Sequence, residues 1–462
     1  MKFKTVKNYA DRIPGDFYKL NFEKPRFATA IKPIMSKKII SFGFLCIVFI
    51  LLLSCKANNS LVKGTPITNS EAAQEKPYLI LISLDGFRWD YVDRFQPPNL
   101  VTFIKSGVQA ESLIPTFPSK TFPNHYTIAT GMYPDKHGII GNSFYSYKNE
   151  KLYKLGNRET VEDGTFYGGT PIWVAAEKEN MVSASFFFVG TEADIQRMHP
   201  SYYYTFDNNI QSGVRVNQAL DWLDMPKKKR PHLITMYFSD MDNTGHDYGP
   251  SNDKKLKETL YALDKHLGDL FKGIKQTGLP VNIIIVSDHG MKDISVNNYL
   301  PIEAVENPTL YKTLNNGAIV NIHPNDNSQI DSIYNYLKTK EKNFKVYKTE
   351  DTPGFEYTPQ NKDWGKLQVL PDVGYYFTSQ QRIERLLEGD NKIFGVHGYE
   401  TNLKEMHGIF YANGPAFKNG YTTDAVKNIH VYPLMTKILE LKNPVDIDGD
   451  LKELKDVLKA TE

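Results

Sequence analysis

Apolar positions along the chain form short runs that alternate with amphipathic stretches. The run Tyr78–Leu84 is continuously apolar and bounded by turn-like residues, as expected of a central parallel strand covered on both faces. Leucines at helical spacing predict a helix over Asp253–Thr277. The remaining pattern predicts strands at Gln109–Ile114, Val182–Phe188, His232–Phe238, Val281–Ser287 and Ile409–Ala412, and helices at Pro98–Lys105, Pro171–Glu179, Gly213–Leu223 and Tyr432–Leu441. This alternation indicates an α/β fold with a mostly parallel sheet.

The pattern is different before residue 77. From Met35 the chain reads MSKKIISFGFLCIVFILLLSC, which is a short basic region, an uninterrupted apolar run and then a cysteine. This segment resembles a bacterial lipoprotein signal peptide. The resemblance implies that Cys55 is lipidated and that the protein is anchored to a membrane of the cell envelope, in the periplasm or facing outward. A plain signal anchor with an incidental Cys55 is the alternative.

Composition sets the remaining boundaries. The stretch before Met35 shows no targeting pattern, so we expect the start of the sequence to be over-extended. The expected organisation is this start plus the signal peptide at 1–54, a polar and flexible tether at 55–76, a folded domain at 77–445 with an inserted cap segment at about 307–381, and a C-terminal tail at 446–462.

The formal charge of +2 hides an uneven distribution. Residues 1–54 hold ten Lys/Arg and three Asp/Glu, which leaves 45 basic and 50 acidic side chains, a net charge of −5, for residues 55–462. Nucleic-acid binding through a basic surface is therefore excluded. The two cysteines are Cys46, inside the signal segment, and Cys55. If the signal peptide is removed and Cys55 is lipidated, no free thiol is left to pair, so we expect no disulfide.

One loop places a hydroxyl beside a predicted helix start. The stretch 115–131 reads PTFPSKTFPNHYTIATG, in which Pro123 suits the first turn of a helix. Free backbone N–H groups at a helix start favour an anionic group such as phosphate, and they stabilise an alkoxide. We interpret Thr121 as the nucleophile. A threonine in this position is usually only a helix cap, but the Asp and His residues that follow favour the nucleophile.

Acidic and imidazole side chains follow three of the predicted strands. Asp85 follows the first strand, Asp242 and His246 follow the fourth, and Asp288 and His289 follow the fifth. Because ligands bind at the carboxyl edge of such sheets, we expect these side chains to meet there. Each residue alone suits a turn or loop. Together, oxygen and imidazole ligands favour a site for zinc or a similar divalent cation.

Six separated segments then resemble the motifs of one family. In chain order they read LISLDGFRWDY, FPSKTFPNHYTIATGMYPDKHGIIGN, FYGGTPIWVAAE, YFSDMDNTGHDYGP, VSDHGM and FGVHGY. They resemble the nucleotide pyrophosphatase/phosphodiesterase family of the alkaline phosphatase superfamily, over about residues 77–440. The resemblance implies an alkaline phosphatase-like α/β fold, with helices on both faces of a mostly parallel central sheet and an inserted cap segment. It also implies a zinc-dependent hydrolase of phosphodiester or pyrophosphate bonds.

The resemblance implies roles for single residues as well. Thr121, in KTFPNHY, would attack phosphorus and form a phospho-threonine intermediate. Two zinc ions are implied at the carboxyl edge of the sheet, one held by Asp242, His246 and His397, and the other by Asp85, Asp288, His289 and the Thr121 oxygen. A zinc-bound alcohol loses its proton far more easily than a free one, and a second zinc can bind a phosphate oxygen and activate water.

Two assignments depend on the family pattern. His407 lies ten residues after His397 and also precedes a glycine, but the family places its ligand in HGY, which favours His397. Asn142, in GIIGN, matches an asparagine that donates to a phosphate oxygen in the family. Its residue type also suits an ordinary turn.

The expected substrate is a nucleotide. In nucleotide-cleaving members of the family, the aromatic after the threonine, here Phe122, stacks on the base together with an aromatic from a downstream loop. The cluster Tyr202–Phe206 offers that second ring, through Tyr204 or Phe206, or is simply an edge strand or packed loop. The products would be nucleoside 5′-monophosphates. Two alternatives stay open, which are hydrolysis of choline-containing lipids and a surface protein that binds metal without catalysis.

Overall fold

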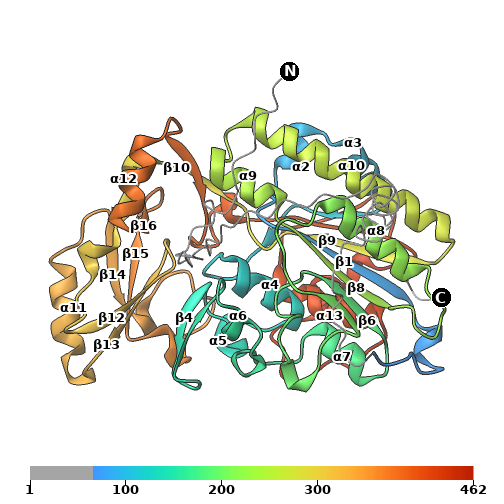
Figure 1. Ribbon diagram of the computed structural model, residues 1–462, viewed down its shortest axis with the longest axis horizontal. Coiled ribbons are helices and arrows are strands. Elements are labelled where there is room, and N and C mark those ends of the chain that lie inside the picture. Colours follow the sequence, from blue (N-terminus) through green and yellow to red (C-terminus); the bar gives the residue numbers. More distant parts are fainter. Residues whose placement is uncertain (1–65, 461–462) are drawn as a thin grey trace, which may run out of the picture. The chain divides into compact units, whose positions relative to one another are not determined.

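The computed structural model describes residues 66–460 (Figure 1). Its central sheet has eight strands in the order β19-β2-β18-β9-β1-β8-β6-β7. Five neighbouring strands run parallel, namely β9 (Val281–Val286), β1 (Tyr78–Leu84), β8 (Leu233–Phe238), β6 (Ser183–Phe186) and β7 (Tyr202–Tyr204). β18 (Phe410–Asn413) runs antiparallel to β9 and to β2 (Val108–Ala110), and β19 (Tyr421–Thr423) forms the edge. The predicted α/β fold with a mostly parallel sheet is confirmed.

Helices cover both faces of this sheet (Figure 1). One face carries α3 (Pro98–Lys105), α8 (Ser212–Leu223), α9 (Asp240–Tyr248) and α10 (Asp253–Thr277), and the other carries α4 (Thr121–Thr130), α7 (Ile172–Lys178) and α13 (Val431–Ile438). The leucine stripe of α10, from Leu256 to Leu270, is fully buried. Alternate residues of β1, Leu79 and Leu81, belong to the core that includes α4 and α13.

The register of the central strands decides where the chemistry lies. Leu84 of β1 pairs with Phe238 of β8, and Ser83 pairs with Val286 of β9. The residues that follow these three strands therefore lie at one edge of the sheet. All seven residues of β1 are buried, which explains the absence of polar alternation in its sequence.

The inserted segment forms a sheet of its own beside the central one (Figure 1). Its antiparallel order is β12-β13-β15-β14, where β12 is Tyr311–Asn315, β13 is Val320–Pro324, β14 is Phe344–Lys348 and β15 is Leu367–Pro371. Together with α11 (Ile330–Lys338) this sheet encloses a separate hydrophobic core. β10 (Lys292–Ser295) and β17 (Ile393–Val396) pair where the chain leaves and rejoins the main domain, and β16 (Tyr376–Thr378) leads into α12 (Gln380–Glu388).

Three predicted segments differ from the structure: one strand, the tether, and the C-terminal tail at 446–462, whose Leu454 and Val457 are buried in the main core. The single strand predicted at Gln109–Ile114 is two short strands, β2 and β3 (Leu113–Ile114), because β2 pairs with β18 and β19 whereas β3 pairs with β20 (Val426–Lys427).

The tether predicted at 55–76 is not free over residues 66–76, since Asn69 is only 2% exposed. Its side-chain amide donates to the carbonyl oxygens of Lys227 and Arg230 at 3.0 and 2.7 Å, and its Oδ1 accepts from Val182 N at 2.7 Å. These partners precede β8 and β6, so the segment lies at the amino-terminal ends of the strands.

The signal segment and Cys55 lie outside the described residues, and their assignments stay predictions. Between residues 66 and 460, no helix combines the length and the apolar character that crossing a bilayer requires.

Candidate active site

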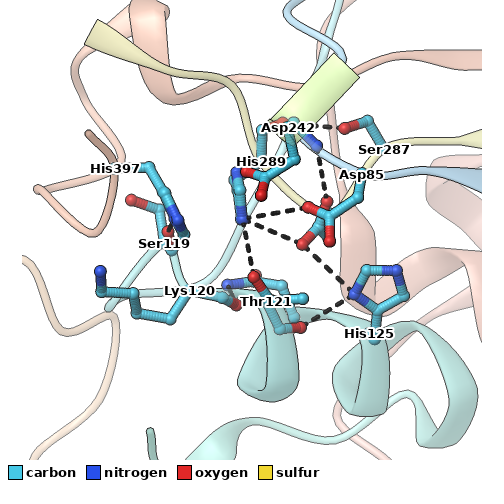
Figure 2. A network of polar contacts seen from close by, with 12 residues as sticks. Asp85, Ser119, Lys120, Thr121, His125, Asp242, Ser287, His289 and His397 are labelled. Atoms are coloured by element: carbon cyan, nitrogen blue, oxygen red, sulfur yellow. Dashed lines mark hydrogen bonds and ion pairs between the residues drawn. The ribbon is translucent and has the colours of Figure 1, made fainter. Parts of the chain in front are cut away.

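Three carboxylates meet at the carboxyl edge of the sheet, and Figure 2 labels two of them, Asp85 and Asp242. Asp85 follows β1, Asp288 follows β9 after one serine, and Asp242 lies in the first turn of α9. Asp85 and Asp288 are each only 1% exposed. A Cβ atom on Gly86 would lie 2.8 Å from Asp242 Cα, and Gly86 has a φ of 65°, so only glycine lets α9 approach this closely.

Three histidines surround these carboxylates in a common orientation. His246, His289 and His397 each donate Nδ1–H to a backbone carbonyl oxygen, at 2.7 Å to Gly395, 2.9 Å to Gly290 and 2.8 Å to Ser119 respectively. Because a carbonyl oxygen only accepts, the ring proton lies on Nδ1 and Nε2 keeps its lone pair. Metal-binding histidines are commonly held in this way.

Free imidazole nitrogens face the carboxylates directly. His246 Nε2 lies 3.4 Å from Asp242 Oδ1, and His289 Nε2 lies 3.5 Å from Asp85 Oδ1 and 3.0 Å from Asp288 Oδ2. None of these three buried oxygens accepts a hydrogen bond within residues 66–460. Such facing lone pairs need a proton or a cation between them, because buried unpaired charge is costly. The donor set fits zinc or a similar divalent cation.

Electrostatics at the cluster point the same way. Burial and then the charges of Asp288 and Asp242 raise the pKa of Asp85 well above its usual range. Burial also acts to raise the pKa of Asp288, but His289 and His125, whenever these rings are protonated, hold this pKa well below its usual range. Crowded carboxylates in one buried site repel one another, and divalent cations relieve this repulsion.

The donor atoms fall into two overlapping groups. One group is Asp85, Asp288 and His289, and the other is Asp242, His289 and His397, with all donor atoms of a group within 4.8 Å of one another. His289 belongs to both groups, and its ring stacks on that of His397, with centroids 3.6 Å apart (Figure 2). His246 lies close by, with its ring centroid 5.2 Å from that of His397. The division of ligands between two ions stays a prediction.

Thr121 opens helix α4 directly beside this cluster. Its Oγ1 lies 3.2 Å from His289 Nε2. Asn124, fully buried, fixes the preceding loop, because its Nδ2 donates to three carbonyl oxygens of the loop and its Oδ1 accepts from Thr116 N at 2.7 Å. Ser119 connects this loop to the His397 loop by accepting from Gly398 N at 3.0 Å. The sequence therefore builds a rigid approach to the threonine.

Asn142 lies at the same helix start. Its Oδ1 accepts from Phe122 N at 3.0 Å. Its amide Nδ2 has no hydrogen-bond partner within residues 66–460, so both of its N–H groups are available to an anionic oxygen near Thr121.

His407 lies away from the carboxylates. Its Nε2–H donates to Thr401 O at 2.8 Å, and its Nδ1 lies 2.9 Å from Ser112 Oγ. The structure thus brings His397, and not His407, to the carboxylate cluster.

The predicted base-stacking aromatics have different surroundings. Phe122 is half-buried, with its ring centroid 6.2 Å from that of Tyr153. Tyr204 stacks on Phe186 at 4.4 Å and its hydroxyl donates to Gln218, which argues against the Tyr204 prediction because one ring face is already covered. Phe206 is 41% exposed. Its ring centroid lies 6.0 Å from that of Tyr237, whose hydroxyl donates to Asp85.

Sequence reasoning missed two contacts of the site. Tyr237 Oη donates to Asp85 Oδ2 at 2.5 Å. Lys120, 4% exposed, donates to Tyr376 Oη at 2.6 Å, and burial lowers the pKa of Lys120 to about 7 against the opposing charge of Asp242. Tyr237 could have been noticed as a polar aromatic at the end of an apolar strand. Nothing in the sequence links Lys120 to Tyr376.

Known proteins resemble this chain over most of its length. The model of the type I phosphodiesterase / nucleotide pyrophosphatase family matches residues 79–400. A venom phosphodiesterase of Crotalus durissus collilineatus is 34% identical over 423 residues, which cover 88% of this chain and 50% of the relative. The chain thus spans about half the length of that relative. A bis(5′-adenosyl)-triphosphatase of Xenopus laevis is 31% identical over 382 residues, which cover 82% of this chain and 80% of the relative.

Solved structures agree with these relatives. Murine ectonucleotide pyrophosphatase/phosphodiesterase 5 superposes with a TM-score of 0.75 at 28% identity, covering 83% of this chain and 100% of that protein. An inactive variant of the same murine protein, in complex with AMP, superposes equally well. The predicted alkaline phosphatase-like fold is confirmed.

Proposed function

Because the chain belongs to the type I phosphodiesterase / nucleotide pyrophosphatase family of the alkaline phosphatase superfamily, we propose that it hydrolyses phosphodiester or pyrophosphate bonds of nucleotides and releases nucleoside 5′-monophosphates. One observation carries this proposal. Three imidazoles, oriented by backbone carbonyls, lie against three carboxylates, two of them fully buried, beside the Thr121 hydroxyl. Without bound cations such an arrangement would destabilise the fold, because the lone pairs and the negative charges face one another.

Two zinc ions are the proposed cofactors. Asp85, Asp288, His289 and Thr121 would hold one ion, and Asp242, His246 and His397 would hold the other. When bound, the ions would lower the pKa of a coordinated alcohol or water and neutralise phosphate oxygens.

Thr121 is the proposed nucleophile. Its Oγ1 forms a bond to phosphorus while the bond from phosphorus to the leaving-group oxygen breaks, and the hydroxyl proton is released to solvent. Water then forms a new P–O bond, the bond to Thr121 breaks, and the monophosphate leaves. The free amide of Asn142 would donate to the phosphate oxygens during both steps.

The nucleotide base would lie between aromatic rings. Phe122 directly follows the nucleophile, and Phe206 exposes its ring next to Tyr237. The relatives support a nucleotide substrate, because one is named for a bis(5′-adenosyl) triphosphate and a structural neighbour holds AMP. Base stacking on an aromatic contributes roughly 1–3 kcal/mol per base.

Product analysis with ATP and with a choline phosphodiester tests the proposal. We expect AMP and pyrophosphate from ATP, and a quenched single turnover of ATP labelled at the α-phosphate should leave the label on Thr121. Thr121→Ala should abolish turnover while zinc stays bound, and Thr121→Ser, which keeps a hydroxyl, should retain partial activity. Turnover of the choline ester alone would favour the lipid phosphodiesterase. Zinc binding without turnover of either compound would leave a non-catalytic metal protein.

We also propose that Cys55 carries a lipid anchor. Metabolic labelling with a fatty-acid analogue should label the wild-type protein and leave Cys55→Ala unlabelled. Label retained after this substitution would refute the anchor without touching the proposed catalysis.

A further inference from the structure

His125 is a fully buried histidine that the proposed chemistry leaves without a role. It lies on α4, one helical turn after Thr121, and none of its surface is exposed. Its Nδ1 lies 2.9 Å from the carbonyl oxygen of Thr121 and 3.2 Å from Asp288 Oδ2. One side chain therefore touches both the nucleophile's backbone and a proposed metal ligand (Figure 2).

The neighbours of His125 fix its tautomer. Both groups at Nδ1, a carbonyl and a carboxylate, can only accept, so Nδ1 carries the proton. Nε2 then keeps its lone pair and accepts from the hydroxyl of Ser83 at 2.8 Å. Ser83 lies in β1, two residues before Asp85, and is fully buried. The imidazole thus connects α4 to β1: its Nδ1–H donates to the Thr121 carbonyl, and Asp288 Oδ2 lies 3.2 Å from the same nitrogen.

Packing fixes the plane of the ring as well. Phe188 and Tyr237 meet the imidazole edge-on, each with its ring centroid 5.3 Å away. A second contact holds Asp288 on the other side, where its Oδ1 accepts from Gly86 N at 3.3 Å. The Asp288 carboxylate is therefore clamped between a backbone amide and the imidazole, with Oδ2 directed to His289 Nε2 at 3.0 Å.

We propose that His125 is a positioning residue, which holds the Asp288 carboxylate and the first turn of α4 in the arrangement that a divalent cation and the Thr121 hydroxyl require. It touches neither substrate nor metal and acts through Asp288 and Thr121. This inference rests on the proposed two-metal function. Groups behind the ligands of a metal typically change its affinity or the activity by about 10- to 100-fold when removed.

Three variants test this role in the full chain. His125→Phe removes both ring nitrogens, His125→Asn keeps an N–H close to the position of Nδ1, and Ser83→Ala removes only the hydroxyl that fixes the tautomer. The readouts are the zinc dissociation constants, from competition with a chromogenic chelator, and kcat and KM for ATP. His137→Phe is the matched control, because His137 is equally buried and its Nε2 contacts Thr127 rather than a carboxylate.

We expect His125→Phe to raise the zinc dissociation constant of one of the two sites, the one that Asp288 would hold, by about 10- to 100-fold. The variant should also lower kcat with little change in KM. His125→Asn should recover most of both losses, and Ser83→Ala should fall between wild type and His125→Phe. His137→Phe should lower the thermal midpoint of the zinc-free protein without changing zinc affinity. If His125→Phe does not fold, Ser83→Ala and His125→Asn decide the question.

Wild-type zinc affinity in Ser83→Ala together with wild-type kcat in His125→Asn and His125→Phe would overturn the positioning role. A loss in His125→Phe that appears only in the zinc-free thermal midpoint, as in His137→Phe, would overturn it too. Failure of the proposed function is a distinct result, since in that case the wild-type chain itself would bind no zinc or hydrolyse no phosphodiester.

Discussion

Replacing Tyr237 by phenylalanine removes one hydrogen bond from the metal cluster and almost nothing else. The Tyr237 hydroxyl donates to Asp85 Oδ2 at 2.5 Å, and Arg215 holds the backbone carbonyl of Tyr237 at 2.7 Å, so the ring stays in place. Burial, followed by the charge of Asp85, raises the pKa of Tyr237 well above its usual value. The hydroxyl is therefore protonated and donates at every pH at which the enzyme works.

The size of the effect follows from the charge of the acceptor. A hydrogen bond to a charged group contributes about 1.5–3 kcal/mol. Without cations, burial and the neighbouring carboxylates raise the pKa of Asp85, which favours its neutral form and makes the bond weaker. Most of the bond's contribution therefore appears when zinc binds and Asp85 is ionised. At about 1.36 kcal/mol per factor of ten, Tyr237→Phe should raise the zinc dissociation constant roughly 10- to 150-fold.

Chelator competition measures this constant directly, and kcat/KM for ATP should fall in parallel. The control is Tyr311→Phe, since the Tyr311 hydroxyl donates to the carbonyl oxygen of Val305, away from the metal cluster. That variant should lose about 1 kcal/mol of unfolding free energy and keep its zinc affinity. Equal zinc affinities for wild type and Tyr237→Phe would refute the claim that Tyr237 orients a metal ligand.

Three further outcomes are expected. His397→Ala should lose one of two bound zinc ions by elemental analysis while His407→Ala keeps both, and the reverse pattern would contradict the ligand assignment. Phe206→Ala should raise KM for ATP roughly 5- to 150-fold if its ring stacks on the base, whereas Tyr204→Ala should lower the thermal midpoint and leave KM unchanged. Burial lowers the pKa of His137 to about 3, below its unfolded value of about 6.5, so its contribution to stability is present above pH 6.5 and is lost as the pH falls. Urea titrations should show the zinc-free wild type losing about 2 kcal/mol more than His137→Asn between pH 8 and pH 5, and equal losses would contradict a buried neutral ring.

Strand ends were predictable because the apolar runs end abruptly. Asp85 and Asp288 directly follow buried runs, and parallel strands place their carboxyl ends at one edge, so their meeting follows from topology. Helix α9 was not predicted, since Asp240–Tyr248 is polar and contains Gly245. A Cβ atom on Gly245 would lie 2.5 Å from Met291 Sδ, so this glycine reflects tertiary packing that a local pattern cannot reveal.

Two further features could not be predicted from the sequence, for the same physical reason. Nothing local distinguishes Tyr204 from Phe206, because the difference is whether Phe186 covers the ring. The contact of Lys120 with Tyr376 joins residues 256 positions apart, from the start of α4 to strand β16. Hydrophobic period and motif spacing report on neighbours in sequence, whereas these contacts join elements that only the tertiary fold brings together.

Asn69 and the residues around it anchor the start of the described chain beside Val182 and Lys227, at the sheet edge opposite to Asp85. The described chain therefore begins at the end of the strands opposite to the proposed metal ligands, so substitutions that loosen Asn69 should change stability and leave the metal cluster intact.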